Sequence, residues 1–207
     1  MSREELNKYL KEDLVYSDAV RYVQCSNYGG AEPLFIAGLS NSLKHYEAGQ
    51  LLRDIPEAYA GELRELEARF EQFGDWEKVK TAAESLMDAE KRLYCHDVPM
   101  QNIACNKNEY WLDSLRLLAQ AELHLNHPKK AEALYKQAID FLNPQLDKKE
   151  LPPDKWGAWM GPPPSLVSFK YAICRDYEAL LRTEKRNDEA DVLHGKANVF
   201  LFPERYP

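Results

Sequence analysis

Histidine and cysteine side chains supply many nucleophiles, proton carriers and metal ligands, and this sequence has five histidines and four cysteines. Most of them lie far apart, and their one cluster is Cys95, His96 and Cys105. A zinc site needs three or four converging ligands, and this spacing matches none of the usual zinc modules. We therefore expect no metal site and interpret the cysteines as small buried residues.

Sequence motifs of catalysis and cofactor binding are missing as well. There is no HExxH or GxSxG, and the glycines at 29, 30 and 38 form neither GxGxxG nor a phosphate loop. A helical enzyme with a site near Cys25, His96 or His124 stays an alternative, but a lone cysteine beside a turn is more often structural. We expect a protein that is not an enzyme and needs no cofactor.

The charge pattern excludes other classes of protein. The net charge is −7, which argues against a protein that coats nucleic acid by neutralising phosphates. Charged residues are scattered through the first 18 positions, and no window approaches the ~18 apolar residues of a spanning helix. We expect a cytoplasmic protein without a membrane segment.

Helices must then position whatever site exists, because apolar residues recur at helical spacing and strand-like alternation is nearly absent. The predicted fold class is all-α. Ser2 and Glu5 fit a capping box that begins the first helix, and the glycine- and proline-rich stretch 26–33 ends it. A second helix is expected from Pro33 to about Arg53.

Three further helix pairs follow. Glycine, proline and polar clusters separate them and end each helix. Between the last two pairs lies a proline-rich insert, 147–165, which cannot be helical throughout. The expected helices span about 56–74, 75–94, 109–126, 129–142, 165–183 and 187–201.

The three pairs align at their inner turns. Gly74, Asn126 and Lys185 occupy the position where a left-handed residue is wanted. Five residues later come Val79, Ala131 and Ala190, which are small enough to let two helices approach closely.

The middle pair resembles the tetratricopeptide repeat (TPR) family, and the resemblance extends over about residues 56–203. Glu67 and Glu178 replace the family's usual small residue in the outer pairs, and the turn residues are more widely spaced than in the family. The resemblance implies antiparallel helix hairpins stacked as an α-solenoid or right-handed superhelical array. The residues that carry it are Leu115, Leu118, Ala119, Ala131, Tyr135 and Ala138, with Pro144 closing the helix.

In such families the first helix of each pair lines a groove that binds a peptide or a partner's helix. Arg64, Arg116 and Arg175 lie at the same distance before the three turn residues, so we hypothesise an arginine ladder on the groove wall. The planar guanidinium fork suits carboxylates and phosphates. The same stripe on the middle pair holds Asp113, Gln120 and His124. The alternative interpretation is three solvated arginines paired with nearby glutamates.

The insert 147–165 is the second candidate, since Trp156, Trp159 and Met160 lie where no helical stripe requires them. Tryptophan is a frequent anchor at protein contacts. The segment is either a binding flap or a cover for the core.

Together these patterns predict one compact domain, in which an N-terminal helix pair (1–54) packs on three TPR-like pairs (55–207). We expect a non-catalytic protein-binding module, acting as an adaptor, chaperone or regulatory sensor, for a peptide partner that an arginine ladder would favour as acidic. The alternative is a structural protein that assembles with itself as a homo-oligomer.

Overall fold

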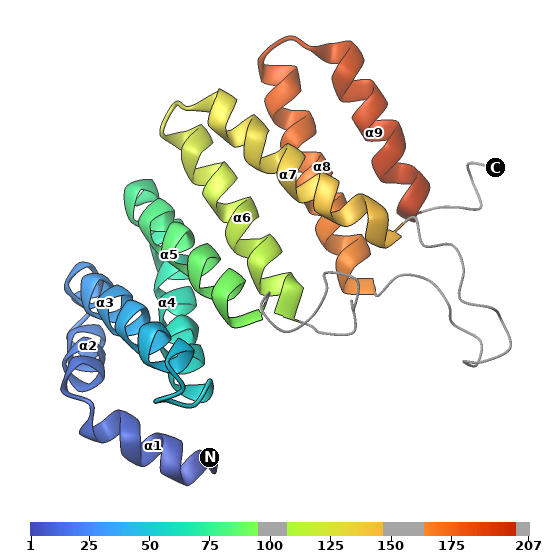
Figure 1. Cartoon of the computed structure of the whole chain (residues 1–207). Coiled ribbons are helices and arrows are strands. Elements are labelled where there is room, and N and C mark those ends of the chain that lie inside the picture. The colour runs from blue at the N-terminus through green and yellow to red at the C-terminus, as the bar shows by residue number, and fades with distance from the viewer. Residues whose placement is uncertain (95–106, 147–163, 202–207) are drawn as a thin grey trace, which may run out of the picture. The chain divides into compact units, whose positions relative to one another are not determined.

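The computed structural model describes residues 1–94, 107–146 and 164–201, and the regular structure in these ranges is entirely α-helical (Figure 1). The all-α prediction is confirmed. The helices of the described ranges are α1 (Arg3–Glu12), α2 (Leu14–Gln24), α3 (Tyr28–Glu47), α4 (Asp54–Phe73), α5 (Trp76–Tyr94), α6 (Lys107–His124), α7 (Pro128–Leu146), α8 (Pro164–Thr183) and α9 (Asn187–Leu201).

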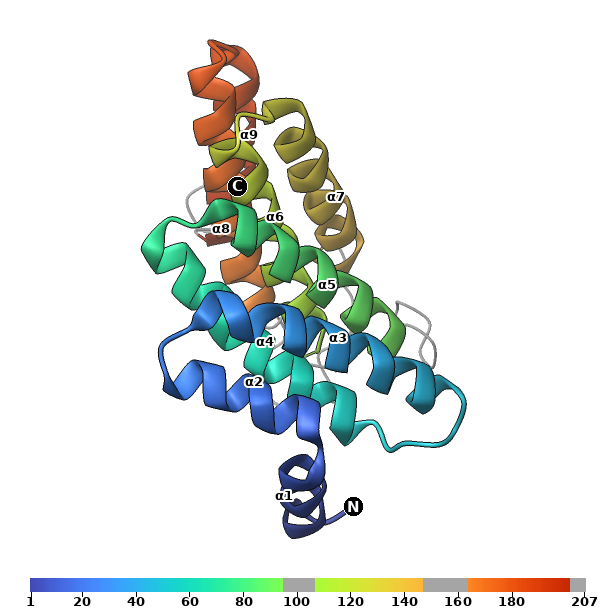
Figure 2. The same ribbon diagram turned by 90° about the vertical axis from the view of Figure 1, so that its left-hand side faces the viewer.

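By their internal contacts the residues form two compact units, 1–99 and 100–207. In the first unit α2 packs on α3, α3 on α4 and α4 on α5, while α1 contacts α2 and α4 (Figure 2). In the second unit α6 packs on α7, α7 on α8 and α8 on α9, and the two first helices α6 and α8 also touch. Each unit therefore contains two antiparallel hairpins in succession. The sequence-based division at residue 54 stays a prediction.

The hairpin turns repeat one hydrogen-bond pattern. Gly74, Asn126 and Lys185 have φ values of 70°, 65° and 62°, as their position in the sequence predicts. In each turn the next residue donates its backbone N–H to a carbonyl five residues back, as Asp75 does to Phe70 at 2.9 Å. This is a Schellman motif, which ends the first helix and reverses the chain within a few residues.

A fourth turn of this kind joins α2 to α3, and sequence reasoning missed it. Ser26 has φ 57°, and Asn27 donates its N–H to the Tyr22 carbonyl at 2.9 Å. The expected start of this helix at Pro33 is wrong, because α3 begins at Tyr28 with the Asn27 side chain capping the Gly30 N–H. The cap supplies a partner for an N–H group of the first turn, so the two glycines begin a helix here instead of ending one.

Two prolines lie inside helices instead of bounding them. Pro33 is in α3, and Pro144 is within the last turn of α7, which continues to Leu146. The expectation that Pro144 closes its helix is therefore wrong. Each proline lacks a backbone N–H and so removes one hydrogen bond from its helix without ending it.

Small residues bring the helices of a hairpin together. Ala19 and Ala119 lie seven residues before their turn residues and are fully buried, and the equivalent positions hold Glu67 and Glu178. A Cβ atom on Gly38 would lie 2.1 Å from the Tyr59 ring, so only glycine allows α3 to pack this closely on α4. Among the described residues, no helix is long and apolar enough to cross a membrane.

Candidate partner-binding surface

Arg116 and Gln120 come together on the first helix of the second unit. They lie one turn apart on α6, and both reach one carboxylate oxygen of Asp176 on α8. Arg116 donates from Nε to Oδ2 at 2.6 Å, and Gln120 donates from Nε2 to the same oxygen at 2.9 Å. The structure thus joins two sequence-predicted site residues through a third residue, on adjacent first helices.

This cluster is half-buried and rests on aromatic rings. The Arg116 and Asp176 side chains are 28% and 25% exposed. Beneath them Tyr135 is buried and stacks on Tyr177, with ring centroids 5.9 Å apart. Burial raises the pKa of Tyr135, and the Asp176 carboxylate raises it further. The polar cluster therefore packs on two buried aromatic rings.

Arg116 and Asp176 retain hydrogen-bonding capacity. Asp176 engages the arginine through Nε, and within the described residues neither Nη of Arg116 nor Oδ1 of Asp176 has a hydrogen-bond partner. One helical turn before and after Asp176 lie the small side chains of Ala172 and Ala179. The surface can both donate and accept hydrogen bonds.

The other residues of the hypothesised stripe lie outside this cluster. Arg175 is half exposed and approaches Glu178 at 3.6 Å, on another side of α8. Asp113 is half-buried on α6, and His124 is exposed at the end of that helix. Arg64 belongs to the first unit, so the three-arginine ladder stays a prediction.

Arg64 differs from Arg116 in its partner, which is a carboxylate of the core. It donates from Nη2 at 2.6 Å and from Nε at 3.1 Å to Glu90 on α5, whose side chain is 0% exposed. This pair holds α4 against α5. A partner that bound Arg64 would have to break its bonds to Glu90, and separating a buried ion pair costs free energy.

Trp156, Trp159 and Met160 of the insert lie outside the described residues, as do Cys95, His96 and Cys105. Among the described cysteines Cys174 is buried, but Cys25 is exposed at the C-terminal end of α2. The interpretation of Cys25 as a buried residue is wrong, because it precedes the turn at Ser26 and faces solvent. No group of three or more His, Cys, Asp or Glu in the described ranges could hold a metal ion.

Asp176 is the member that sequence reasoning missed. It follows Arg175 directly, and the aligned position in the middle pair is Leu117, which is buried. Alignment alone therefore gave it no polar role. The sequence does show an acidic residue directly after Arg175. Its pairing with Arg116 can be inferred only when α6 and α8 are known to be neighbours.

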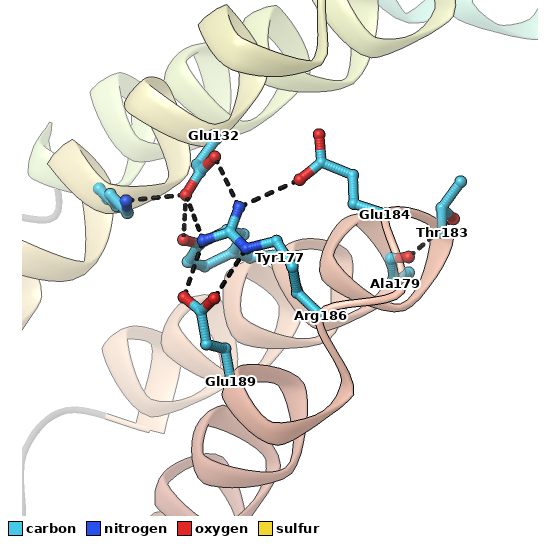
Figure 3. A network of polar contacts seen from close by, with 8 residues as sticks. Glu132, Tyr177, Ala179, Thr183, Glu184, Arg186 and Glu189 are labelled. Atoms are coloured by element: carbon cyan, nitrogen blue, oxygen red, sulfur yellow. Dashed lines mark hydrogen bonds and ion pairs between the residues drawn. The ribbon is translucent and has the colours of Figure 1, made fainter.

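A second polar network fixes the two hairpins of this unit to each other (Figure 3). Arg186, in the α8–α9 turn, donates from Nη1 and Nη2 to the two oxygens of Glu132 on α7 at 2.9 and 3.0 Å. Its Nε donates to Glu189, and Tyr177 donates its hydroxyl to Glu132 at 2.9 Å. Arg186 and Lys136 lower the pKa of Glu132 to about 2. The network keeps α8 in register with α7, and so holds Asp176 opposite Arg116.

Comparison with solved structures identifies the fold of these helix hairpins. The chain matches a structure from Podospora anserina, described as a putative kinesin light chain with nearly identical TPR-like repeats, over 91% of this chain and 74% of that one. The TM-score is 0.51 and the sequence identity 14%. The fold is that of a TPR-like helical repeat array. No protein-family model matches the chain, and neither does a curated protein.

Proposed function

We propose that the chain is a TPR-like protein-interaction module whose second unit binds an extended segment of a partner across α6 and α8. The observation that carries this is the Asp176-centred cluster, which lies on two successive first helices, is partly exposed and keeps hydrogen-bonding atoms without a partner in the described residues. Supporting it, TPR-like repeats serve as partner-binding surfaces in the family, and the fold of this chain matches them.

The chemistry of the cluster sets the kind of segment that fits. Arg116 and Asp176 neutralise each other, so the surface offers a donor and an acceptor side by side with little net charge. A main-chain amide or a carboxamide side chain satisfies both groups at once. An acidic side chain would be attracted by Arg116 and repelled by Asp176. We therefore propose a polar peptide held by its main chain, in preference to the acidic peptide expected from three arginines.

Selection from a random peptide library displayed on phage tests the proposal. Peptides selected on the whole chain are measured by calorimetry against wild type, Arg116→Gln and Asp176→Asn. We expect each variant to weaken binding by about tenfold, because each removes one charged hydrogen-bond partner. Arg182→Gln is the matched control, since its arginine pairs with Glu178 and Asp191 on the α9 side of α8.

Equal affinity of all four proteins for every selected peptide would show that the segment binds elsewhere. Self-assembly is the competing function, and sedimentation of the unliganded protein addresses it. A concentration-dependent oligomer that Asp176→Asn disrupts would make a second copy the partner. Adaptor, chaperone and sensor roles are finer assignments that depend on which partner is found.

A further inference from the structure

A separate hollow in the first unit has the composition of a cation site. It has a volume of about 420 Å³ and lies where the α1–α2 junction meets α3 and α4. Its lining includes Tyr9, Asp13 and Tyr59, together with Gly38 and Asn41. The hollow opens to solvent, because Asn41 is exposed. It belongs to a different unit from the Asp176 cluster and does not depend on it.

Asp13 is the fixed charge of this hollow. Its Oδ1 accepts the backbone N–H groups of Val15 and Tyr16 at 3.0 and 3.1 Å, which caps α2, and its Oδ2 accepts the Tyr59 hydroxyl at 2.8 Å. A carboxylate has about four acceptor positions, so Oδ2 can take one more donor. The three bonds hold the carboxylate in place before any ligand arrives.

Two tyrosines flank the carboxylate. Burial and then the charge of Asp13 raise the pKa of Tyr9, and burial followed by the hydrogen bond to Asp13 raises that of Tyr59. Both rings therefore lie near one negative charge and remain neutral phenols. Tyr59 is only 1% exposed and holds Asp13 through its hydroxyl, whereas Tyr9 is 36% exposed. A carboxylate beside an accessible aromatic ring attracts ammonium and guanidinium groups by charge and by cation–π interaction.

Hydrogen-bonding groups on the rim are available to a ligand. Within the described residues, the Tyr9 hydroxyl and the Asn41 amide have no hydrogen-bond partner. His45, also on the rim, pairs with Gln50 through Nδ1. These groups can form hydrogen bonds with the main chain of a partner segment whose basic side chain lies in the hollow.

The charge of the whole unit agrees with a basic occupant. Residues 1–99 contain 12 Lys and Arg against 19 Asp and Glu, a formal charge of −7. A field of this sign raises the local concentration of cations and speeds their association. We infer that this hollow is a docking pocket for a lysine or arginine side chain of a partner protein, bound between Asp13 and the ring of Tyr9.

Nuclear magnetic resonance of the ¹⁵N-labelled full chain tests the pocket with blocked amino acids. The probes are N-acetyl-arginine amide and N-acetyl-lysine amide. N-acetyl-glutamine amide and N-acetyl-glutamate amide supply a neutral and an anionic comparison. We expect saturable chemical-shift changes at the amides of Tyr9, Gly38 and Asn41 with the two cations at millimolar concentration. The neutral and anionic probes should bind at least about fivefold more weakly.

Asp13→Asn removes the charge and retains the cap of α2, because asparagine caps as well as aspartate. Binding of both cations should fall about fivefold or more, while Asp18→Asn, an exposed carboxylate on α2 outside the lining, should leave it unchanged. If Asp13→Asn lowers the melting temperature, Tyr9→Leu gives the same test, with the exposed Tyr22→Leu as its control. Equal shifts with the neutral probe, or full cation binding in Asp13→Asn and Tyr9→Leu, overturns the inference.

Discussion

Arg64 and Arg175 occupy aligned positions and differ in what removing them should do. Arg64 bonds twice to a fully buried carboxylate, while Arg175 is half exposed and 3.6 Å from its partner. We predict that Arg64→Ala lowers the free energy of unfolding by about 2 to 4 kcal/mol, because Glu90 remains in the core. Arg175→Ala should cost less than about 0.5 kcal/mol. Urea denaturation measures both, and equal losses would refute the distinction.

This difference also affects how the arginine ladder is tested. A triple Arg→Ala variant would lose binding through unfolding of the first unit as well as through loss of contacts. Single substitutions at Arg116 avoid this, because its partner Asp176 is itself partly exposed and can be solvated.

Lys185 adopts a left-handed conformation that suits glycine better. Its φ of 62° costs a non-glycine residue about 1 to 2 kcal/mol. Replacing the lysine by glycine removes this cost, but the greater flexibility of glycine in the unfolded chain offsets part of the gain. We predict that Lys185→Gly raises the unfolding free energy by about 0.5 kcal/mol. Gly74→Ala is the converse control and should cost about 1 kcal/mol, since only backbone strain opposes it there. Thermal melts of both variants check the signs.

At the scale of elements, the joint between two hairpins is built differently in each unit. Glu32 and Glu132 lie six residues after their turn residues, Ser26 and Asn126. Glu132 accepts two hydrogen bonds from Arg186, the residue that follows Lys185 in the next turn. In the first unit the residue that follows Gly74 is Asp75, which lies near Glu32 and repels it. In the second unit this contact is a charge pair. In the first unit Glu32 and Asp75 do not form one, and the hairpins are instead linked by Arg92 on α5, which donates to Glu47 on α3 at 2.7 and 2.8 Å.

Acid should therefore loosen the second joint. The folded-state pKa of Glu132 is about 2 against an ordinary 4.5, so its stabilisation is full above pH ~4.5 and is lost as the pH falls towards 2. We predict that Glu132→Gln removes about 1 to 2 kcal/mol at pH 7, after allowance for solvent screening, and that wild type and variant converge near pH 2. Unfolding measured across this range gives the result, and parallel pH profiles would contradict it.

The same change in the first unit should act in the opposite direction. Oε1 of Glu32 is buried and has no hydrogen-bond partner in the described residues, and Lys78 is bonded to Asp75. Burial raises the pKa of Glu32, so ionisation opposes folding, and stability falls as the pH rises through this raised pKa. We predict that Glu32→Gln stabilises the unit by about 0.5 to 1 kcal/mol at pH 7. A loss of stability comparable to that of Glu132→Gln would disprove it.

At the scale of the whole molecule, two units with separate cores should open separately. Leu63 in the first unit and Leu115 in the second are both 0% exposed. We predict that Leu63→Ala costs about 3 kcal/mol and reduces hydrogen-exchange protection of α4 and α5 by about a hundredfold, with α8 unchanged. Leu115→Ala is the mirror control. Equal loss of protection in both units after either change would show a single cooperative domain.

Local sequence was sufficient for most of the helices and three of the described turns. Gly74, Asn126 and Lys185 were predicted correctly, because a helix end is decided by a few neighbouring residues and their backbone hydrogen bonds. The turn at Ser26 was missed for a related reason. The glycines after it suggested a break, but the Asn27 cap keeps them helical.

The pairing of distant residues was decided by tertiary structure alone. The link from Arg116 to Asp176 spans 60 positions, and that from Arg64 to Glu90 spans 26, so neither follows from helical periodicity. Spacing gives the face of a helix that a residue occupies, but not which helix lies opposite. Sequence therefore determined that this protein is a set of helix hairpins, and packing determined that one arginine is bonded to a core carboxylate while another is bonded to a partly exposed one.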